Sequence, residues 1–330
     1  MKIRLTFTKT NDEESYIEFS EDVKTIKLTD KYIASIDLTP LESCSRLREL
    51  RLNRNQLETI DLTPLGSCTA LELLDFEYNY LPHIELSPLN SCVALQELNL
   101  YQNNLQHIDL VPLSSCVALQ TLDLGLNQFQ NIDLVPLSFC INLNKFILSK
   151  NQLQTIDLTP LVSCINLNWL LLTENQLQAV DLSPLSSCIA LRRLNVHRNQ
   201  LQNIDVSPLS SCTSLTNIDI GDNQIETIDL SPLSSCTALR MLGLYGNQLQ
   251  TIDLSPLSSC NTLQEVHLGA NQLKTVDLTP LNSCPTLGWL TLEENLLDSI
   301  DLTPLRSCTN LQELDLSGND IESVDLSPLT

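Results

Sequence analysis

The sequence predicts an α/β solenoid, in which stacked coils share a parallel β-sheet on one side and short helical turns on the other. A 24-residue unit recurs from Val23 without insertion or deletion, which gives thirteen copies, the last ending early at Thr330. Every unit contains an alternating apolar segment and a proline-leucine segment in fixed order. Because one unit has too few apolar residues to fold alone, neighbouring units must share one core. We therefore expect one repeat domain over residues 23–330.

The first half of each unit predicts a strand. The unit reads L-x-x-L-x-L-x-x-N-x-L-x-x-I-D-L-[ST]-P-L-x-x-C-x-x. In the first full copy, Leu50 and Leu52 flank the polar Arg51, which is the period of a strand with one buried face. Asn55 then ends the strand, where its amide can bond backbone groups of the turn. The preceding copy has Lys31 at this position, so we expect a looser turn there.

The second half of each unit predicts a short helical turn. Thr63 supplies a hydroxyl for the helix cap, and Pro64 suits the first helical position. The apolar Cys68 follows at a spacing that fits a 3₁₀ or α turn with one buried face. Val111 and Val135 replace the capping hydroxyl in two copies, which predicts weaker turns there.

The cysteines hold one position of the repeat. All twelve are 24 residues apart: Cys44, Cys68, Cys92, Cys116, Cys140, Cys164, Cys188, Cys212, Cys236, Cys260, Cys284 and Cys308. Equivalent positions predict buried, unpaired thiols that pack like small apolar residues. Free thiols in this number persist in a reducing environment, so we expect a cytoplasmic protein.

The repeat resembles that of the leucine-rich-repeat family. The resemblance covers residues 23–330, and twelve copies keep the asparagine, from Asn55 through Asn319. The D-[ILV]-[ST]-P-L stretch is similar to that of internalin-type bacterial repeats, which have shorter units and leucine where Cys44 and its equivalents stand. The resemblance implies a right-handed superhelix, or horseshoe, with a concave sheet and convex 3₁₀ or α turns. It also implies that ligands dock on the outward side chains of the concave strands.

The two ends differ from the repeat. Residues 1–22 alternate apolar and polar side chains twice, at Leu5 and Phe7 and again at Ile17 and Phe19, which predicts a β-hairpin cap. The chain stops inside a unit, so we expect either a fragment or an end covered by a partner or by another copy. No continuous apolar stretch opens the chain, so no signal peptide is expected.

The charge of the chain restricts its partners. The formal net charge is -22 and the sequence pI is about 4.3. Nucleic acid and anionic membrane both attract basic surfaces, so neither is an expected partner. A protein partner is the remaining expectation.

The main candidate site lies in the middle of the predicted sheet. Ile147 and Leu171 occupy one outward column of successive strands, and Trp169 stands beside them, which is typical of an apolar binding hot spot. Basic and polar residues flank this group: Lys145, Lys150, Arg193, Asn195, His197 and Arg198. No Lys or Arg lies between Asn55 and Asn144. The pattern predicts a protein partner that offers an acidic segment and an apolar anchor.

Two smaller aromatic groups are secondary candidates on the same face. Tyr78 and Tyr101 form one of them, and Tyr245 and Trp289 belong to the other, with His267 between them.

The sequence does not predict a cation-binding site, although two groups of residues carry suitable donor atoms. An Asp or Glu stands two residues before the Ser/Thr of every unit, as Asp61 does, and such a file of carboxylates could hold Ca²⁺. The same carboxylates can instead bond local backbone N–H groups, which we expect. His83 and His107, with Glu85 and Asp109, offer a zinc-like donor set, but no other unit repeats it.

The sequence does not predict catalysis. It lacks phosphate-binding glycine motifs and the H-E-x-x-H motif, and its cysteines are expected to be buried. We therefore expect no catalytic residue, no cofactor and a non-catalytic scaffold for protein–protein interaction. The alternatives are a regulatory or targeting segment of a larger enzyme and a self-associating structural protein.

Overall fold

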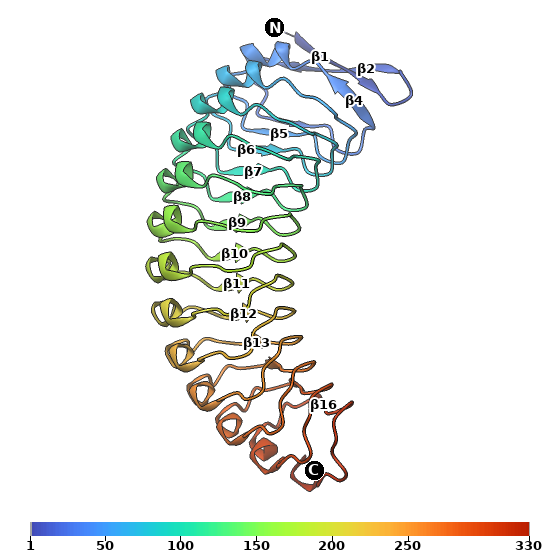
Figure 1. Ribbon diagram of the computed structural model, residues 1–330. Coiled ribbons are helices and arrows are strands. Elements are labelled where there is room, and N and C mark those ends of the chain that lie inside the picture. Colours follow the sequence, from blue (N-terminus) through green and yellow to red (C-terminus); the bar gives the residue numbers. More distant parts are fainter. Residues whose placement is uncertain (1, 330) are drawn as a thin grey trace. The chain divides into compact units, whose positions relative to one another are not determined.

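The chain forms two compact units, Met1–Leu167 (unit 1) and Asn168–Thr330 (unit 2). The computed structural model describes residues 2–329 (Figure 1). Each unit is a stack of 24-residue coils, as the repeat predicts. None of the helices described is long and apolar enough to cross a membrane.

Unit 1 begins with a small antiparallel sheet. Its strands occur in the order β2-β1-β4, with β1 pairing with both others. They span β1 (Lys2–Lys9), β2 (Glu14–Ser20) and β4 (Ile33–Ile36). Leu5 and Phe7 of β1 point into the core, because alternate residues of a strand face the same side. The hairpin β1–β2 lies where the sequence analysis expects one, whereas the third strand, β4, belongs to the first repeat copy.

The strand side of each unit is a parallel sheet with one short strand per coil. In unit 1 these strands are β3 (Thr25–Lys27), β5 (Glu49–Arg51), β6 (Leu73–Asp75), β7 (Glu97–Asn99), β8 (Thr121–Asp123) and β9 (Lys145–Ile147). In unit 2 they are β10 (Trp169–Leu171), β11 (Arg193–Asn195), β12 (Asn217–Asp219), β13 (Met241–Gly243), β14 (Glu265–His267), β15 (Trp289–Thr291) and β16 (Glu313–Asp315). Residues 24 apart lie opposite each other, as Leu50 does with Leu74.

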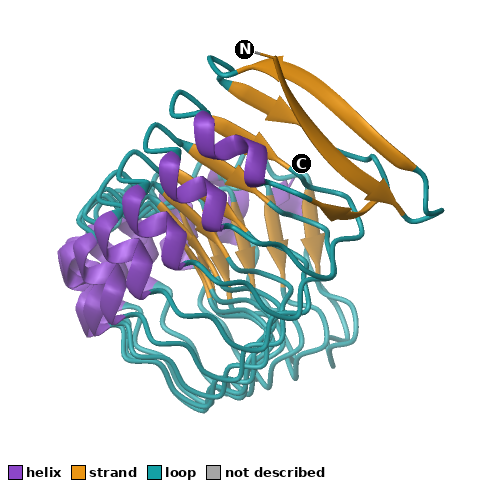
Figure 2. Cartoon of the chain, turned by 90° about the horizontal axis from the view of Figure 1, so that it is seen from above, coloured by secondary structure: helices purple, strands orange, loops and turns teal. Residues whose placement is uncertain are grey.

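The helical side of each unit is a column of 3₁₀ turns, which Figure 2 shows beside the strands. In unit 1 the turns are η1 (Thr39–Ser43), η2 (Thr63–Ser67), η3 (Ser87–Ser91), η4 (Val111–Ser115), η5 (Val135–Phe139) and η6 (Thr159–Ser163). In unit 2 they are η7 (Ser183–Ser187), η8 (Ser207–Ser211), η9 (Ser231–Ser235), η10 (Ser255–Ser259), η11 (Thr279–Ser283), η12 (Thr303–Ser307) and η13 (Ser327–Leu329). The parallel sheet and the 3₁₀ turns confirm the predicted solenoid coil.

The repeated carboxylate bonds the backbone of each turn, as expected, whereas the Ser/Thr hydroxyl does not provide the expected cap. Thr63 is the first residue of η2, the residue before it makes no side-chain cap bond, and the threonine hydroxyl does not cap the turn. Instead, Asp61 Oδ1 accepts a hydrogen bond from the Thr63 N–H at 2.9 Å. Asp109 makes the same bond to Val111 at 2.9 Å, so a coil without the hydroxyl forms the same turn. The weaker turns expected at Val111 and Val135 are therefore not evident in the geometry.

The asparagine of each unit ties neighbouring coils together. Asn199 Nδ2 donates to the Val196 carbonyl of its own coil at 2.9 Å and to the Leu172 carbonyl of the preceding coil at 3.1 Å. Its Oδ1 accepts from the Leu177 N–H at 3.0 Å. In the first copy, Lys31 lacks this amide, but its own N–H donates to Asn55 Oδ1 at 3.0 Å.

The core is made of the repeat's leucines and cysteines. All twelve cysteines are free and buried, as predicted. The Cys236 thiol lies 3.4 Å from the Leu209 carbonyl and 3.6 Å from the Cys212 carbonyl, which accept weak S–H hydrogen bonds. Burial raises the pKa of the Cys236 thiol to about 12. The thiols are therefore held in the unreactive neutral form at neutral pH.

Candidate functional site

Every coil presents the same outward positions on its strand side. The first and third strand residues point away from the core, because the middle residue is buried. Two further side chains follow, and the second of them has a left-handed backbone in nearly every coil, with φ of 53° at Arg198 and 60° at Lys150. The backbone geometry is the same in each coil, whereas the side chains at these outward positions differ between coils. A rigid frame that carries variable side chains is suited to recognition of a ligand.

Unit 1 holds three residues of the main predicted site. Lys145 and Ile147 begin and end β9, where they lie opposite Thr121 and Asp123 of β8. Both side chains are half-buried, and Lys150 is exposed. Only part of the Ile147 side chain is therefore accessible to a partner.

Unit 2 holds the rest of the main predicted site, of which Trp169 and Arg193 form the centre. These residues lie opposite each other on β10 and β11, and the Arg193 guanidinium carbon is 5.8 Å from the Trp169 ring centroid. Such stacking is a favourable cation–π contact. The Arg193 Nε atom is buried and has no hydrogen-bond partner among the described residues. Trp169 and Leu171 are half-buried, so the tryptophan packs on its neighbour while keeping part of its surface accessible.

The other basic residues of this group face carboxylates. Arg198 Nε is 3.1 Å from Asp222 Oδ2, and His197 Nε2 is 3.4 Å from the same oxygen. Asn195 Nδ2 donates to Asp219 Oδ2 at 3.2 Å. The basic character expected at His197 and Arg198 is thus largely balanced by the next coil. Sequence reasoning missed these two aspartates, although each lies 24 residues after a predicted site residue.

The tyrosine pair of unit 1 lies beside acidic residues. The rings of Tyr78 and Tyr101 are 5.7 Å apart and inclined at 58°, and the Arg54 guanidinium lies 4.8 Å from the Tyr78 ring. Asp75 is only 3% exposed and lies 3.5 Å from Arg51 Nη1. The structure brings the two predicted tyrosines together, as their spacing of about one coil suggests.

Asp123 is a perturbed carboxyl group that the sequence analysis did not single out. It lies on β8, and its Oδ1 accepts from the Gly125 N–H at 2.9 Å. Burial, together with the smaller effect of the negative charges on Glu77, Glu97 and Asp75, raises the pKa of this carboxyl to about 6. The signal for it was the absence of any Lys or Arg between residues 55 and 144.

The third predicted group lies on β13 to β15 of unit 2. His267 Nε2 is 3.3 Å from Glu265 Oε2, and Trp289 lies opposite Glu265. Tyr245 is exposed, and its pKa is raised by burial and by the nearby Glu294. This group is aromatic and acidic, so it differs in charge from the main group.

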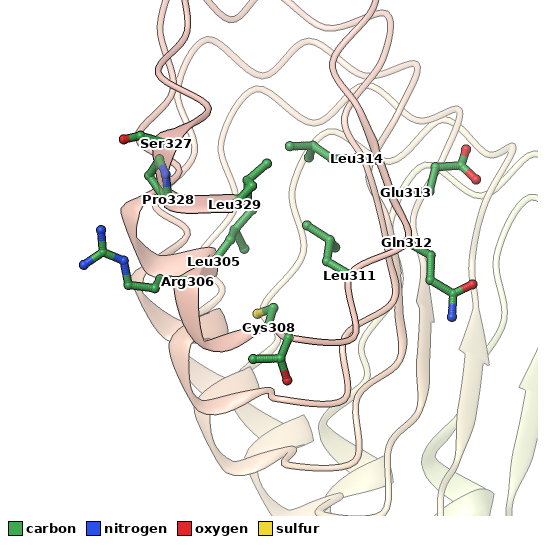
Figure 3. A pocket seen from close by; sticks show the side chains of 11 residues that line it. Leu305, Arg306, Cys308, Leu311, Gln312, Glu313, Leu314, Ser327, Pro328 and Leu329 are labelled. Atoms are coloured by element: carbon green, nitrogen blue, oxygen red, sulfur yellow. The ribbon is translucent and has the colours of Figure 1, made fainter.

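A hollow lies against the last coil of unit 2, and Figure 3 shows leucine side chains pointing into it. Leu305, Leu311, Leu314 and Leu329 line it, with Cys308 at its floor. Leu311 and Leu314 hold core positions of the repeat but are only half-buried. The hollow is therefore the flank of the shared core and not a separate polar site.

The cation sites weighed from the sequence do not assemble. Across residues 2–329, no group of three or more His, Cys, Asp or Glu side chains is placed to hold a metal. Glu85 and Asp109, the acidic neighbours of His83 and His107, instead accept backbone bonds from Ser87 and Val111. The repeated carboxylates therefore accept hydrogen bonds from the backbone of the 3₁₀ turns.

Family models match most of the chain. The model described as leucine rich repeat matches residues 189–249 and 261–321. The model described as BspA type leucine rich repeat region matches residues 13–135 and 67–179, which together span just over half of the chain. No curated protein matches the sequence.

Solved structures share the fold. An internalin (inlF) of Listeria monocytogenes is 29% identical with a TM-score of 0.77, over 95% of this chain and 86% of that one. A Leptospira interrogans leucine-rich-repeat protein is 23% identical with a TM-score of 0.78, over 86% and 70%. The functional domain of InlJ from Listeria monocytogenes, which includes a cysteine ladder, is 21% identical with a TM-score of 0.58, over 90% and 69%.

Proposed function

The chain belongs to the leucine-rich-repeat family, and we propose that it is a non-catalytic scaffold that binds another protein on the strand side of its coils. Leucine-rich-repeat domains generally mediate protein–protein interaction. The proposal places the contact on the outward strand residues, which vary between coils while the framework stays constant. The cytoplasmic location expected from the free thiols remains part of this proposal.

The pair Trp169 and Arg193 is the observation that carries the proposed site. A half-buried tryptophan with a guanidinium stacked on it is typical of interface hot spots, which are enriched in these two residue types. Arg193 makes no ion pair among the described residues, and its buried Nε lacks an acceptor. A carboxylate of the partner would pair with the accessible part of the half-buried Arg193 guanidinium, and an apolar side chain beside it would cover Trp169 and Leu171. This supports a protein partner with an acidic segment and an apolar anchor.

The other charges of unit 2 sharpen this expectation. Because Arg198 and His197 already face Asp222, they offer little attraction to a second carboxylate. Binding is therefore expected to depend on Arg193 far more than on Arg198. With a net charge of -22, neither nucleic acid nor anionic membrane is a proposed partner.

Affinity capture from native extract with two matched pairs of variants tests the proposal. Trp169→Ala combined with Leu171→Asp is compared with Tyr16→Ala combined with Leu296→Asp, two exposed residues outside the candidate groups, and Arg193→Ala is compared with Arg306→Ala in η12. Loss of a hot-spot side chain typically weakens binding by about 2 kcal/mol, or roughly thirtyfold. We expect the first member of each pair to lose the partner and the second to keep it. Equal capture by all four variants, with unchanged circular dichroism, would contradict the proposed site.

A further inference from the structure

A second surface lies on the helical side of unit 1, away from the strand residues discussed above. Eight apolar side chains between residues 93 and 165 are each 46% to 59% exposed. They are Val93, Val111, Val117, Val135, Phe139, Ile141, Val162 and Ile165. Exposed apolar residues normally occur singly, and a contiguous group of several hundred Å² marks an interaction site.

The repeat itself does not require these residues. Val93, Val117, Ile141 and Ile165 directly follow the cysteine of four consecutive coils. The same position carries a hydroxyl residue in five other coils, at Ser45, Thr69, Thr213, Thr237 and Thr309, and Ile189, Asn261 and Pro285 in the remaining three. Phe139 stands at a position that is serine in every other complete copy. Stability of the coil therefore does not account for the apolar choice.

The exposed residues lie in one contiguous face. The turns η3, η4, η5 and η6 pack in sequence order, each against the next. Asn142 Nδ2 donates to the Val117 carbonyl at 2.9 Å, and Asn166 Nδ2 donates to the Ile141 carbonyl at 3.3 Å. These bonds hold the turn after each cysteine beside its neighbour, so the aliphatic side chains form a ladder with one rung per coil.

The carboxylates near this face lie at its edge, where Asp109 and Asp133 accept hydrogen bonds from the Val111 and Val135 N–H groups. Residues 86–96, 110–122, 134–144 and 158–167 contain no Asp, Glu, Lys or Arg. The corresponding stretch of the first copies differs, because it carries Glu42, Arg46, Arg48 and Glu72. An apolar face whose carboxylates lie only along one edge is chemically distinct from the rest of a chain with a net charge of -22.

We propose that this ladder is a homodimer interface, in which two copies of the chain pack their helical sides of unit 1 against each other. A twofold interface pairs a surface with itself, so its rungs must match their own spacing. The apolar side chains of two identical ladders have the same spacing, so they can interdigitate along the whole length of the ladder. A partner without this repeat would meet only a few rungs.

Charge favours a second copy at this face over any other part of the surface. Two chains of net charge -22 repel each other wherever carboxylates approach. At physiological ionic strength, charges more than about 8 Å apart are largely screened. A neutral contact surface therefore allows two acidic chains to meet with the least repulsion. Added salt screens what remains, so the dimer strengthens as ionic strength rises.

Sedimentation velocity of the whole chain, under reducing conditions and over a concentration series, tests the proposal. The wild-type chain is expected to reach twice its mass of 36.9 kDa, at lower concentration in 500 mM than in 50 mM NaCl. The test variant combines Val117→Thr, Phe139→Ser and Ile141→Thr, residues that other coils already carry there. It is expected to raise the dimer dissociation constant at least tenfold. The matched control is Leu296→Gln, which replaces an exposed apolar residue of unit 2 by the repeat's own glutamine.

The outcomes separate cleanly. Thermal unfolding of the variants below the dissociation constant shows whether each fold is intact. A wild-type chain that stays monomeric throughout overturns the proposal and leaves the face to another partner. A dimer that the triple variant retains, or that Leu296→Gln disrupts equally, places the interface elsewhere and also overturns it.

Discussion

At the scale of single residues, the repeated asparagine stabilises the stack through buried polar bonds. Asn199 satisfies two carbonyls and one N–H that are buried in neighbouring coils. We expect Asn199→Ala to lower the free energy of unfolding by about 1–3 kcal/mol, because those groups lose their partner. Urea unfolding measures it, with the exposed Gln178→Ala as control, which should change stability by less than about 0.5 kcal/mol. Equal effects of the two substitutions would show that the amide is dispensable.

Asp123 gives the protein an unusual pH dependence at one residue. Its pKa is about 6 in the folded chain, against about 3.9 in an unfolded one. Between these values the native state holds a proton that the unfolded state has released. The contribution of Asp123 therefore stabilises the fold at low pH and is lost as the pH rises toward and beyond 6.

The variant Asp123→Asn isolates this contribution. The amide oxygen can still accept the Gly125 N–H, as Asn99 accepts the Tyr101 N–H one coil earlier. We expect the variant to be more stable than wild type at pH 7, by at most about 3 kcal/mol, and to lose this advantage near pH 4. Chemical denaturation at both pH values measures the difference, and a constant difference across the range would contradict the raised pKa.

At the scale of one element, the 3₁₀ turn depends on its preceding carboxylate. Asp253 Oδ1 accepts from the Ser255 N–H at 2.8 Å, and its Oδ2 accepts from the Ser255 hydroxyl at 2.9 Å. Two natural coils keep the first bond without the hydroxyl, at Val111 and Val135. We expect Asp253→Ala to destabilise by about 1 kcal/mol, the usual loss of a cap. The substitution Ser255→Val should have less than half that effect in the same thermal unfolding assay.

The elements show what a repeat sequence can and cannot predict. The strand, the turn and the buried thiol follow from apolar spacing within one unit, and the structure confirms them. The capping partner was assigned to the wrong residue, because a Ser/Thr-Pro pair reads as a helix start when only local sequence is considered. The addition of β4 to the N-terminal hairpin was missed because it pairs residues about 30 positions apart.

The candidate site was less predictable than the coil for the same reason. Outward positions follow directly from the period of the strand, so the stacking of Trp169 with Arg193 could be anticipated from their spacing of one unit. The neutralisation of His197 and Arg198 depends on side-chain rotamers that reach into the next coil toward Asp222. The net charge of this surface therefore depends on contacts between adjacent coils, and it cannot be predicted from the sequence of one unit alone.

At the scale of the whole molecule, each coil of a repeat protein is stabilised mainly by the coils next to it. A coil that encloses its side chains less completely opens at lower free energy. Cys308 lies in the last complete coil, and burial raises its pKa, as it does for the central Cys236, which reaches about 12. Both thiols are therefore protected by burial and by their neutral form until their coils open.

Alkylation of the native protein with iodoacetamide, followed by mass spectrometry, makes this difference measurable. Within unit 2, we expect Cys308, which is 4% exposed and lines the hollow described above, to react at least tenfold faster than the fully buried Cys236. The reason is that modification requires local opening, which costs less free energy where the coil encloses its thiol less completely. Denatured protein serves as the control in which all twelve thiols react alike. Rapid, uniform alkylation in the native state would instead mean that the thiols are not enclosed by the stacked coils, and the assignment of the opposite faces would be wrong as well.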